Sequence, residues 1–327
     1  MVLAMILLGG AVRLTGSGLS MVDWQPLLGI MPPLNEIQWQ EAFLLYQQYP
    51  EFKLLNKDMQ LPEFKFIFFM EYAHRILGRI VGLVFFLPLI WVSLRSEFSV
   101  RFKLWLWFIF VLGGLQGLMG WYMVQSGLVD NPHVSQYRLT AHLLLAVFIY
   151  ILLVRTAWGM HLVRSGFVQI QRNSTLAWWS LIIVFLMLAT GGLVAGTKAG
   201  FIYNSFPKMG DDWIPAMLFA LQPWWLNFFE NPVAIQFLHR WLAFGVLLLV
   251  VAFAFKLRSH RDGMTGQLAT LMIAAVGIQI FLGIVTLLYK VPVSLGVLHQ
   301  CGAIILLTTV VCSWTLYLNP LRFRANS

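Results

Sequence analysis

Long apolar runs separated by polar segments fill most of the chain. A helix needs about 20 apolar residues to cross the hydrocarbon core of a bilayer, and only the first run is clearly short of that length. We therefore expect eight membrane helices, the first of which is either tilted or continues upstream of Met1. A signal peptide is disfavoured because no small-residue cleavage site follows this run. The runs lie near residues 2–14, 66–94, 104–124, 139–157, 175–197, 233–255, 268–289 and 294–317.

The overall composition agrees with a chain that crosses the membrane many times. Of its 327 residues, 59% are hydrophobic and 11% are charged, and the mean hydropathy is +0.77. Such values exclude a soluble enzyme and make lipid the expected surroundings. The net charge is +9, but the basic residues form no single patch or arm of the kind that binds nucleic acid. The two cysteines, Cys301 and Cys312, would be about 16 Å apart on one helix, so they cannot form a disulfide with each other.

The distribution of basic residues between the loops predicts the orientation of the chain in the membrane. Loops 95–103, 155–172 and 256–266, together with the C-terminal tail, hold eleven basic residues but only Glu97 and Asp262 as acids. Because basic loops stay on the cytoplasmic side, we expect both termini in the cytoplasm. The eleven residues are Arg95, Arg101, Lys103, Arg155, Arg164, Arg172, Lys256, Arg258, Arg261, Arg322 and Arg324.

Two long segments fall on the opposite, outer side. The first contains a polar amphipathic stretch, 35–60, in which Trp39, Phe43 and Leu44 follow a helical period. We expect this stretch to lie across the outer membrane interface. The second, 198–231, is rich in Trp, Phe and Pro, a composition that suits the headgroup region.

The apolar runs repeat as two sets of four. An even number of helices gives both sets the same orientation, so the sets should be related by an axis along the membrane normal. We therefore expect an all-α integral membrane protein whose eight transmembrane helices form two four-helix bundles in a parallel, pseudo-two-fold repeat, with a first half at 1–160 and a second half at 161–327. The matching pairs are Leu8-Gly9-Gly10 with Thr190-Gly191-Gly192, His74-Arg75 with His239-Arg240, Gln116 and Gly120 with Gln279 and Gly283, and His142 with His299.

Ionisable side chains gather at the start of the second apolar run. Glu71 and His74 are three residues apart and share one helix face, while Arg75 and Arg79 are one turn apart on a neighbouring face. Ionisable groups inside a membrane segment are costly and usually mark a functional site.

Four of the seven histidines lie near the outer ends of even-numbered runs, at one depth. A single histidine there would be explained equally well by a hydrogen bond between helices, but four at matched positions of a repeat predict that they ligate something. They are His74, His142, His239 and His299, and the other three, in loops, are expected to be solvated: His133, His161 and His260.

Two facing imidazoles favour the binding of haem. Imidazole also binds zinc and copper, but each half offers only two histidines and no thiolate at that level, whereas a six-coordinate haem needs two axial ligands. Four arginines near the histidines could pair with haem propionates, and interfacial snorkelling is the alternative for each of them. They are Arg75, Arg79, Arg138 and Arg240. The helix glycines would leave room for a flat macrocycle, although ordinary helix packing explains them equally well.

The two halves differ at one polar position. Glu71 stands one turn before its histidine, whereas the second half has Gln236 there. A carboxylate in only one half suggests that this half does chemistry and that the other moves electrons.

At these residues the chain resembles the haem A synthase family in its proteobacterial and mitochondrial form. The resemblance implies an inner-membrane oxidoreductase that converts the C8 methyl group of haem O to a formyl group by successive hydroxylation with water-derived oxygen. It implies a haem b cofactor between His239 and His299, haem O near His74 and His142, and a role for Glu71 in the oxidation, with both haem sites toward the periplasm. A haem O synthase, an electron acceptor such as a quinone and a second copy of the chain are the protein and redox partners to expect. The matching stretches are Gly9 to Met21, Trp24-Gln25-Pro26, Pro32-Pro33, Glu51 to Met59, Glu71 to Arg75 and the three later histidine helices.

One departure and two alternatives accompany this resemblance. Some members carry a cysteine pair in the first outer loop, and this loop has none. Electrons must therefore leave through haem or a quinone. Cys301 is expected to be a core residue.

A bis-histidine cytochrome b that only transfers electrons would have two equivalent haems and no role for Glu71. A transporter for haem or another anion would need polar residues along the inner halves of the helices, which offer almost none.

Overall fold

The computed structural model describes residues 1–22, 31–129, 132–167, 170, 174–260, 262–318 and 323. Within these ranges every element is a helix, apart from an isolated bridge between Met209 and Asp212. The motif Trp24-Gln25-Pro26 and the loop residues Arg172, Arg261, Arg322 and Arg324 lie outside the described residues.

In the part of the chain that the structure describes, seven helices are long and apolar enough to cross a membrane, so the protein is a multi-pass membrane protein. The prediction of spanning helices is confirmed for seven of the eight runs, while α1, at Val2–Leu14, is an apolar helix of 13 residues and shorter than a span. The seven are α4 (Leu61–Leu94), α5 (Val100–Gln125), α6 (Gln136–Arg164), α7 (Thr175–Gly196), α9 (Pro232–Arg258), α10 (Gly263–Leu288) and α11 (Val293–Thr315).

Polar capping residues set where several of these helices begin. In α4 the backbone N–H of Gln60 donates to Glu63, so the helix starts five residues before its apolar run. Side-chain oxygens of Ser99, Ser174, Asn231 and Asp262 accept from backbone N–H groups at the starts of α5, α7, α9 and α10. Each of these bonds satisfies a donor that the helix itself leaves open.

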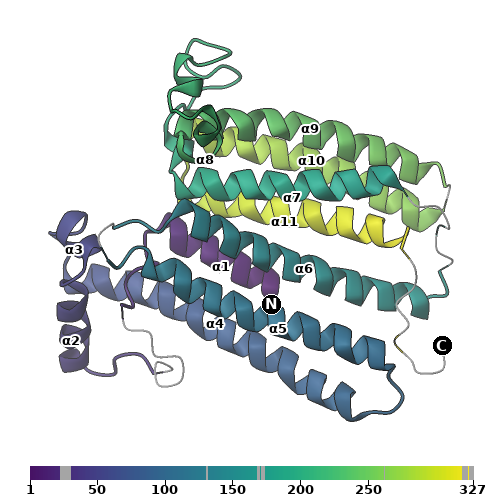
Figure 1. Ribbon diagram of the computed structural model, residues 1–327, viewed down its shortest axis with the longest axis horizontal. Coiled ribbons are helices and arrows are strands. Elements are labelled where there is room, and N and C mark those ends of the chain that lie inside the picture. The colour runs from purple at the N-terminus through teal and green to yellow at the C-terminus, as the bar shows by residue number, and fades with distance from the viewer. Residues whose placement is uncertain are drawn as a thin grey trace.

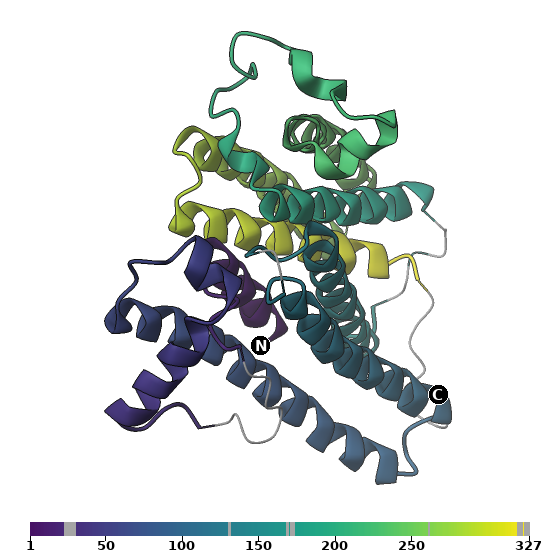
Figure 2. The same ribbon diagram turned by 60° about the vertical axis from the view of Figure 1, so that its left-hand side comes forward.

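The long helices run side by side and form two groups (Figures 1 and 2). In the first, α1 contacts α4 and α6, and α5 contacts α4 and α6; in the second, α7 and α10 each contact α9 and α11. The groups meet where α6 contacts α7 and α11, and where α1 contacts α11. The largest buried apolar cluster lies in the second group and extends to α6, so the second group is the more tightly packed.

Two helix ends in the two groups have the same local structure. Thr15 after α1 and Thr197 after α7 both have φ −87° and ψ 0°. Each hydroxyl donates to the carbonyl four residues earlier, at 2.8 Å and 2.7 Å. The next residues, Gly16 and Lys198, both have positive φ, at 65° and 56°.

The contact between the groups depends on a close approach of α6 and α7. A Cβ atom added to Gly196 would lie 2.7 Å from the Cα of Gln136, and one added to Gly192 would lie 3.2 Å from the Cα of Thr140. The small side chains of α7 therefore allow direct backbone contact, as is common between membrane helices.

The first outer segment packs against the start of α4. It contains α2 (Glu36–Tyr46) and α3 (Pro50–Leu54). As the period predicts, Trp39 and Phe43 are buried, and they contact aromatic rings of α4. Leu44 was predicted on the same face, but it is 58% exposed, because its position is rotated away from the Trp39 and Phe43 face.

The second outer segment forms a compact cap beside the start of α9. It contains η1 (Ala199–Phe201), η2 (Ala216–Phe219), η3 (Trp224–Leu226) and α8 (Asn227–Glu230). Asn227 and Asn231 hold it by donating to backbone carbonyls of Leu221 and Met217, at 2.8 Å and 2.7 Å. Both outer segments lie at one end of the helices, and α11 ends at the other end (Figure 1).

Candidate functional site

The imidazoles of His239 on α9 and His299 on α11 lie near each other in an edge-to-face arrangement. Their ring centres are 6.5 Å apart, and their planes cross at 73°. A metal–imidazole bond is about 2 Å long, and a ring nitrogen lies about 1 Å from the ring centre, so two rings on opposite sides of one metal have centres about 6 Å apart. The pair therefore fits one six-coordinate iron between the rings.

Polar side chains hold these two rings in place. The Oγ1 of Thr190 on α7 lies 2.8 Å from the Nδ1 of His239. The Nε2 of Gln279 on α10 lies 3.1 Å from the Nδ1 of His299, and a Cβ atom on Gly283 would lie 2.9 Å from the same ring.

The first half contains a similar arrangement around His142. The Nε2 of Gln116 on α5 lies 3.2 Å from the Nδ1 of His142, and a Cβ atom on Gly120 would lie 3.1 Å from the ring. Gln116 and Gly120 thus match Gln279 and Gly283 of the second half in contacts as well as in sequence.

His74 on α4 lies against α1 and toward His142. A Cβ atom on Gly9 would be 3.1 Å from the Nε2 of His74. The structure therefore brings His239 and His299 together as a ring pair, and it places His74 against α1 and His142 against α5 in the first half.

Glu71 is buried, with 3% of its surface exposed. Its Oε2 accepts from the backbone N–H groups of Ser20 and Met21, both at 2.9 Å, and from the Ser20 hydroxyl at 2.8 Å. Its Oε1 accepts from Arg75 at 2.5 Å. The carboxylate therefore ties the first outer segment to α4, a contact that the sequence did not predict.

Arg75 and Arg240 bind the two outer segments in matching ways. Arg75 donates to the carbonyl of Met21 at 2.8 Å. Arg240 donates to the carbonyls of Tyr203 and Ser205, at 2.8 Å and 2.9 Å. Gln236, which corresponds to Glu71, also donates to Tyr203, at 3.0 Å.

These backbone bonds leave further donors on the arginines, since each guanidinium has five N–H groups. Within the described residues, the buried Nε of Arg240 has no hydrogen-bond partner, which suits a carboxylate ligand beside His239. Arg138 donates to the carbonyl of Tyr122 at 2.8 Å and lies over its ring. Arg79 follows Arg75 by one turn of α4 and is half-buried.

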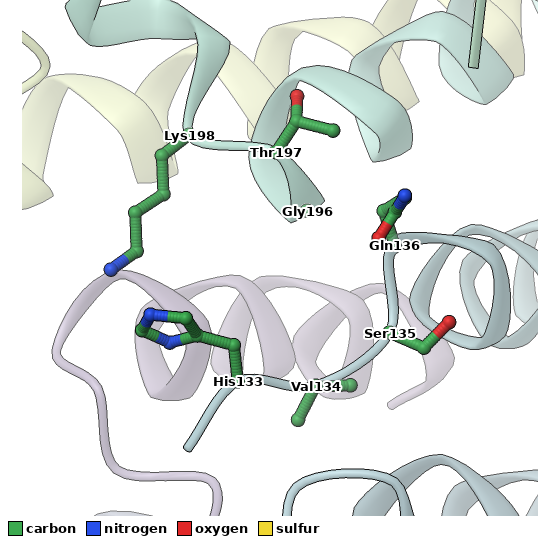
Figure 3. Close-up of a pocket in the computed structure, with 7 residues that line it drawn as sticks. All are labelled: His133, Val134, Ser135, Gln136, Gly196, Thr197 and Lys198. Atoms are coloured by element: carbon green, nitrogen blue, oxygen red, sulfur yellow. The ribbon is translucent and has the colours of Figure 1, made fainter. Parts of the chain in front are cut away.

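A separate hollow of about 340 Å³ lies where the start of α6 meets the end of α7 (Figure 3). His133 and Lys198 line it, together with Ser135 and Thr197. The four helix histidines are not among its lining residues, so the hollow is distinct from the two histidine pairs.

Sequence reasoning assigned no role to two residues that connect the site to its surroundings. Arg13 of α1 donates to the carbonyl of Ala195 at the end of α7, at 2.9 Å, and it stands in one of the stretches that carry the family resemblance. Thr190 contacts His239. The only sequence feature that pointed to Thr190 is its position beside Gly191 in the repeat.

The fold and the histidines define a polytopic helical membrane protein with two helix histidines in each half, of which His239 and His299 lie as a ring pair. The chain belongs to the cytochrome oxidase assembly protein family COX15-CtaA, whose model matches residues 1–311.

Curated relatives support the same assignment over nearly the whole chain. A protein of Nitrosospira multiformis named "Heme A synthase" is 47% identical over 319 residues, which are 95% of this chain and 88% of the relative. Proteins with the same name from Nitrosomonas eutropha and a Bradyrhizobium species are 45% and 43% identical, over 95% and 94% of this chain and 89% and 85% of their own lengths. No solved structure matches the chain significantly.

Proposed function

We propose that this protein is a haem A synthase, a membrane enzyme that converts haem O to haem A. The family assignment and relatives of 41–47% identity that carry this name support the activity. The observation that carries the proposal for this chain is the presence of two histidine pairs, one in each half, with matching Gln and Gly contacts.

We assign the resident cofactor, haem b, to His239 and His299. The separation of 6.5 Å between their ring centres supports this assignment, as does the unpartnered Nε of Arg240, which could pair with a propionate. Haem b would accept electrons from the substrate site and pass them on to an acceptor such as a quinone.

We assign the substrate, haem O, to His74 and His142. Conversion of the C8 methyl group to a formyl group consumes one water and releases four protons and four electrons. Glu71 lies one turn from His74, and its carboxylate could stabilise or accept a proton from the oxidised intermediate. In the structure its oxygens are held by Ser20, Met21 and Arg75, so in this role it would also position the outer segment. Arg75, Arg79 and Arg138 are the cationic groups available to the substrate's propionates.

The same proposal includes the finer architecture. Two four-helix bundles, at 1–160 and 161–327, are supported by the two sets of helix contacts and by the matching helix ends at Thr15 and Thr197. For these bundles to contain eight spans, α1 must cross the membrane with the help of tilt or local bilayer thinning. The outer segments then face the periplasm, and both termini face the cytoplasm.

A cytochrome b that only transfers electrons is the second candidate. The observation that favours it is the complete engagement of the Glu71 carboxylate by protein donors, which is also what a purely structural carboxylate would show.

Pigment analysis separates the two candidates. Haem extracted from cells that make haem O should contain haem A only when this protein is expressed. Haem O alone in both samples, with the purified protein still coloured, would favour the cytochrome.

A further inference from the structure

We propose that Thr190 is a positioning residue that makes the His239 site a permanent haem site, whereas Leu8, at the corresponding place, leaves the His74 site exchangeable. This inference rests on the proposed function, because it takes one haem as a resident cofactor and the other as a substrate.

The hydrogen bonds of Thr190 determine which nitrogen of His239 carries the proton. The Thr190 Oγ1 lies 2.9 Å from the carbonyl oxygen of Met187 and 2.8 Å from the Nδ1 of His239. A carbonyl can only accept, so the one arrangement that forms both bonds sends the hydroxyl proton to Met187 and the Nδ1 proton to the hydroxyl. This arrangement leaves Nε2 as the nitrogen with a free lone pair for iron.

Thr190 forms these bonds at a buried position. Its side chain is 8% exposed, and water therefore has little access to compete for the bond to His239. The ring is held in one tautomer and one orientation before haem arrives. A hydrogen bond to the ring nitrogen that does not bind the metal also raises the basicity of a ligating imidazole.

The first half lacks this hydroxyl. His74 lies against Gly9 as His239 lies against Gly191, and the residues before these glycines are Leu8 and Thr190. The leucine side chain has no polar atom, so it cannot orient the imidazole.

This difference matches what the two sites must do. A substrate site has to release its product after each reaction, whereas a cofactor site has to retain its haem through many reactions. Loss of the group that hydrogen-bonds a metal-ligating histidine typically weakens metal binding by about 10–100-fold, which is a large enough difference to separate retention from exchange.

The test uses Thr190→Val, which removes the hydroxyl with little change in shape, in the full-length purified protein. We expect its resident haem to transfer to an excess of a haem-scavenging globin about 10–100-fold faster than wild type. We also expect a higher midpoint potential, because a less basic imidazole stabilises ferric iron less. Thr190→Ser keeps the hydroxyl and should restore both values.

Thr309→Val is the matched control. Thr309 is buried on α11, and its hydroxyl also donates to the carbonyl three residues earlier, at 2.8 Å. Its removal should leave haem transfer and potential unchanged. The reciprocal variant Leu8→Thr should slow the release of haem from the first half, and it provides a result even if Thr190→Val does not fold.

If a folded Thr190→Val protein transfers haem to the globin at the wild-type rate and has the wild-type midpoint potential, the inference is overturned while the proposed function stands. If Thr190→Val does not fold, unchanged release in Leu8→Thr would overturn it instead. Failure of the proposed function has a different signature, because pigment extracted from cells that make haem O and express the wild-type protein would then contain no haem A.

Discussion

The carboxylate of Glu71 has four donors around it and almost no exposure. Such an arrangement fixes a negative charge within one helical turn of His74. It also makes the first outer segment depend on this one side chain, because Ser20 and Met21 lie about 50 residues away in the chain. Under the proposed function, Glu71 would therefore both take part in the oxidation and hold the first outer segment in place.

Glu71→Gln tests which of these roles dominates. We expect conversion of haem O to fall by about 100-fold or more, because an amide cannot accept a proton, while the haem spectrum stays close to wild type. Extracted pigment and absorption spectra measure the two effects. Glu63→Gln, on the same helix at its outer end, is the control and should change neither; loss of haem from Glu71→Gln would instead give Glu71 a structural role.

Glu51 is the second buried carboxyl, and it lies outside the membrane spans, in α3. Burial raises its pKa from 4.5 to about 7, and the hydroxyl of Tyr46 donates to it at 3.0 Å. The folded protein therefore binds this proton more tightly than the unfolded chain does.

The raised pKa predicts how the stability of the first outer segment depends on pH. Between pH 4.5 and about 7 the unfolded chain loses the proton of Glu51 before the folded protein does, so stability should fall as the pH rises through this window. Hydrogen exchange of α2 and α3 amides at several pH values measures this. Glu51→Gln should remove the slope, and Glu41→Gln, at an exposed position of α2, should keep it; an unchanged slope in Glu51→Gln would contradict the assignment.

At the scale of whole elements, the approach of α6 to α7 is the closest contact with backbone atoms between the two halves that the glycines define. Gly196→Ala would place a methyl group 2.7 Å from the Cα of Gln136, and neither backbone can yield easily. We expect a loss of about 1–3 kcal/mol in the free energy of unfolding, visible as a lower melting temperature in detergent.

Gly82→Ala is the control for this substitution. Nothing lies within 4 Å of a Cβ atom at Gly82 of α4, so alanine should be neutral or stabilise the helix by up to about 1 kcal/mol. Equal melting temperatures for Gly196→Ala and wild type would show that α6 and α7 can separate without cost.

Hydrophobic runs predicted the positions of the helices well because lipid forces each span to satisfy its own backbone hydrogen bonds. The ends were less predictable, since polar caps extend α4 beyond its apolar run to Leu61. The four histidines could be identified from the repeat. The contacts of Glu71 with Ser20 and Met21 could not, because they join segments far apart in sequence without any periodic pattern. Thr190 gave little signal because a threonine within a helix usually bonds only its own backbone.

For the molecule as a whole, the repeat provides two similar sites, and a few substitutions make them different. Glu71 corresponds to Gln236 and Leu8 to Thr190, whereas Gln116 and Gly120 have the same counterparts in both halves. Under the proposed function, these differences would give one half a site for oxidation and the other a site for electron transfer.

The most direct test of this division is the haem content of purified His239→Ala and His74→Ala proteins. We expect His239→Ala to lose most of the resident haem, because it removes an axial ligand of the cofactor, and His74→Ala to keep most of it. Equal depletion in the two variants, or a colourless wild-type protein after expression with ample haem, would contradict the account.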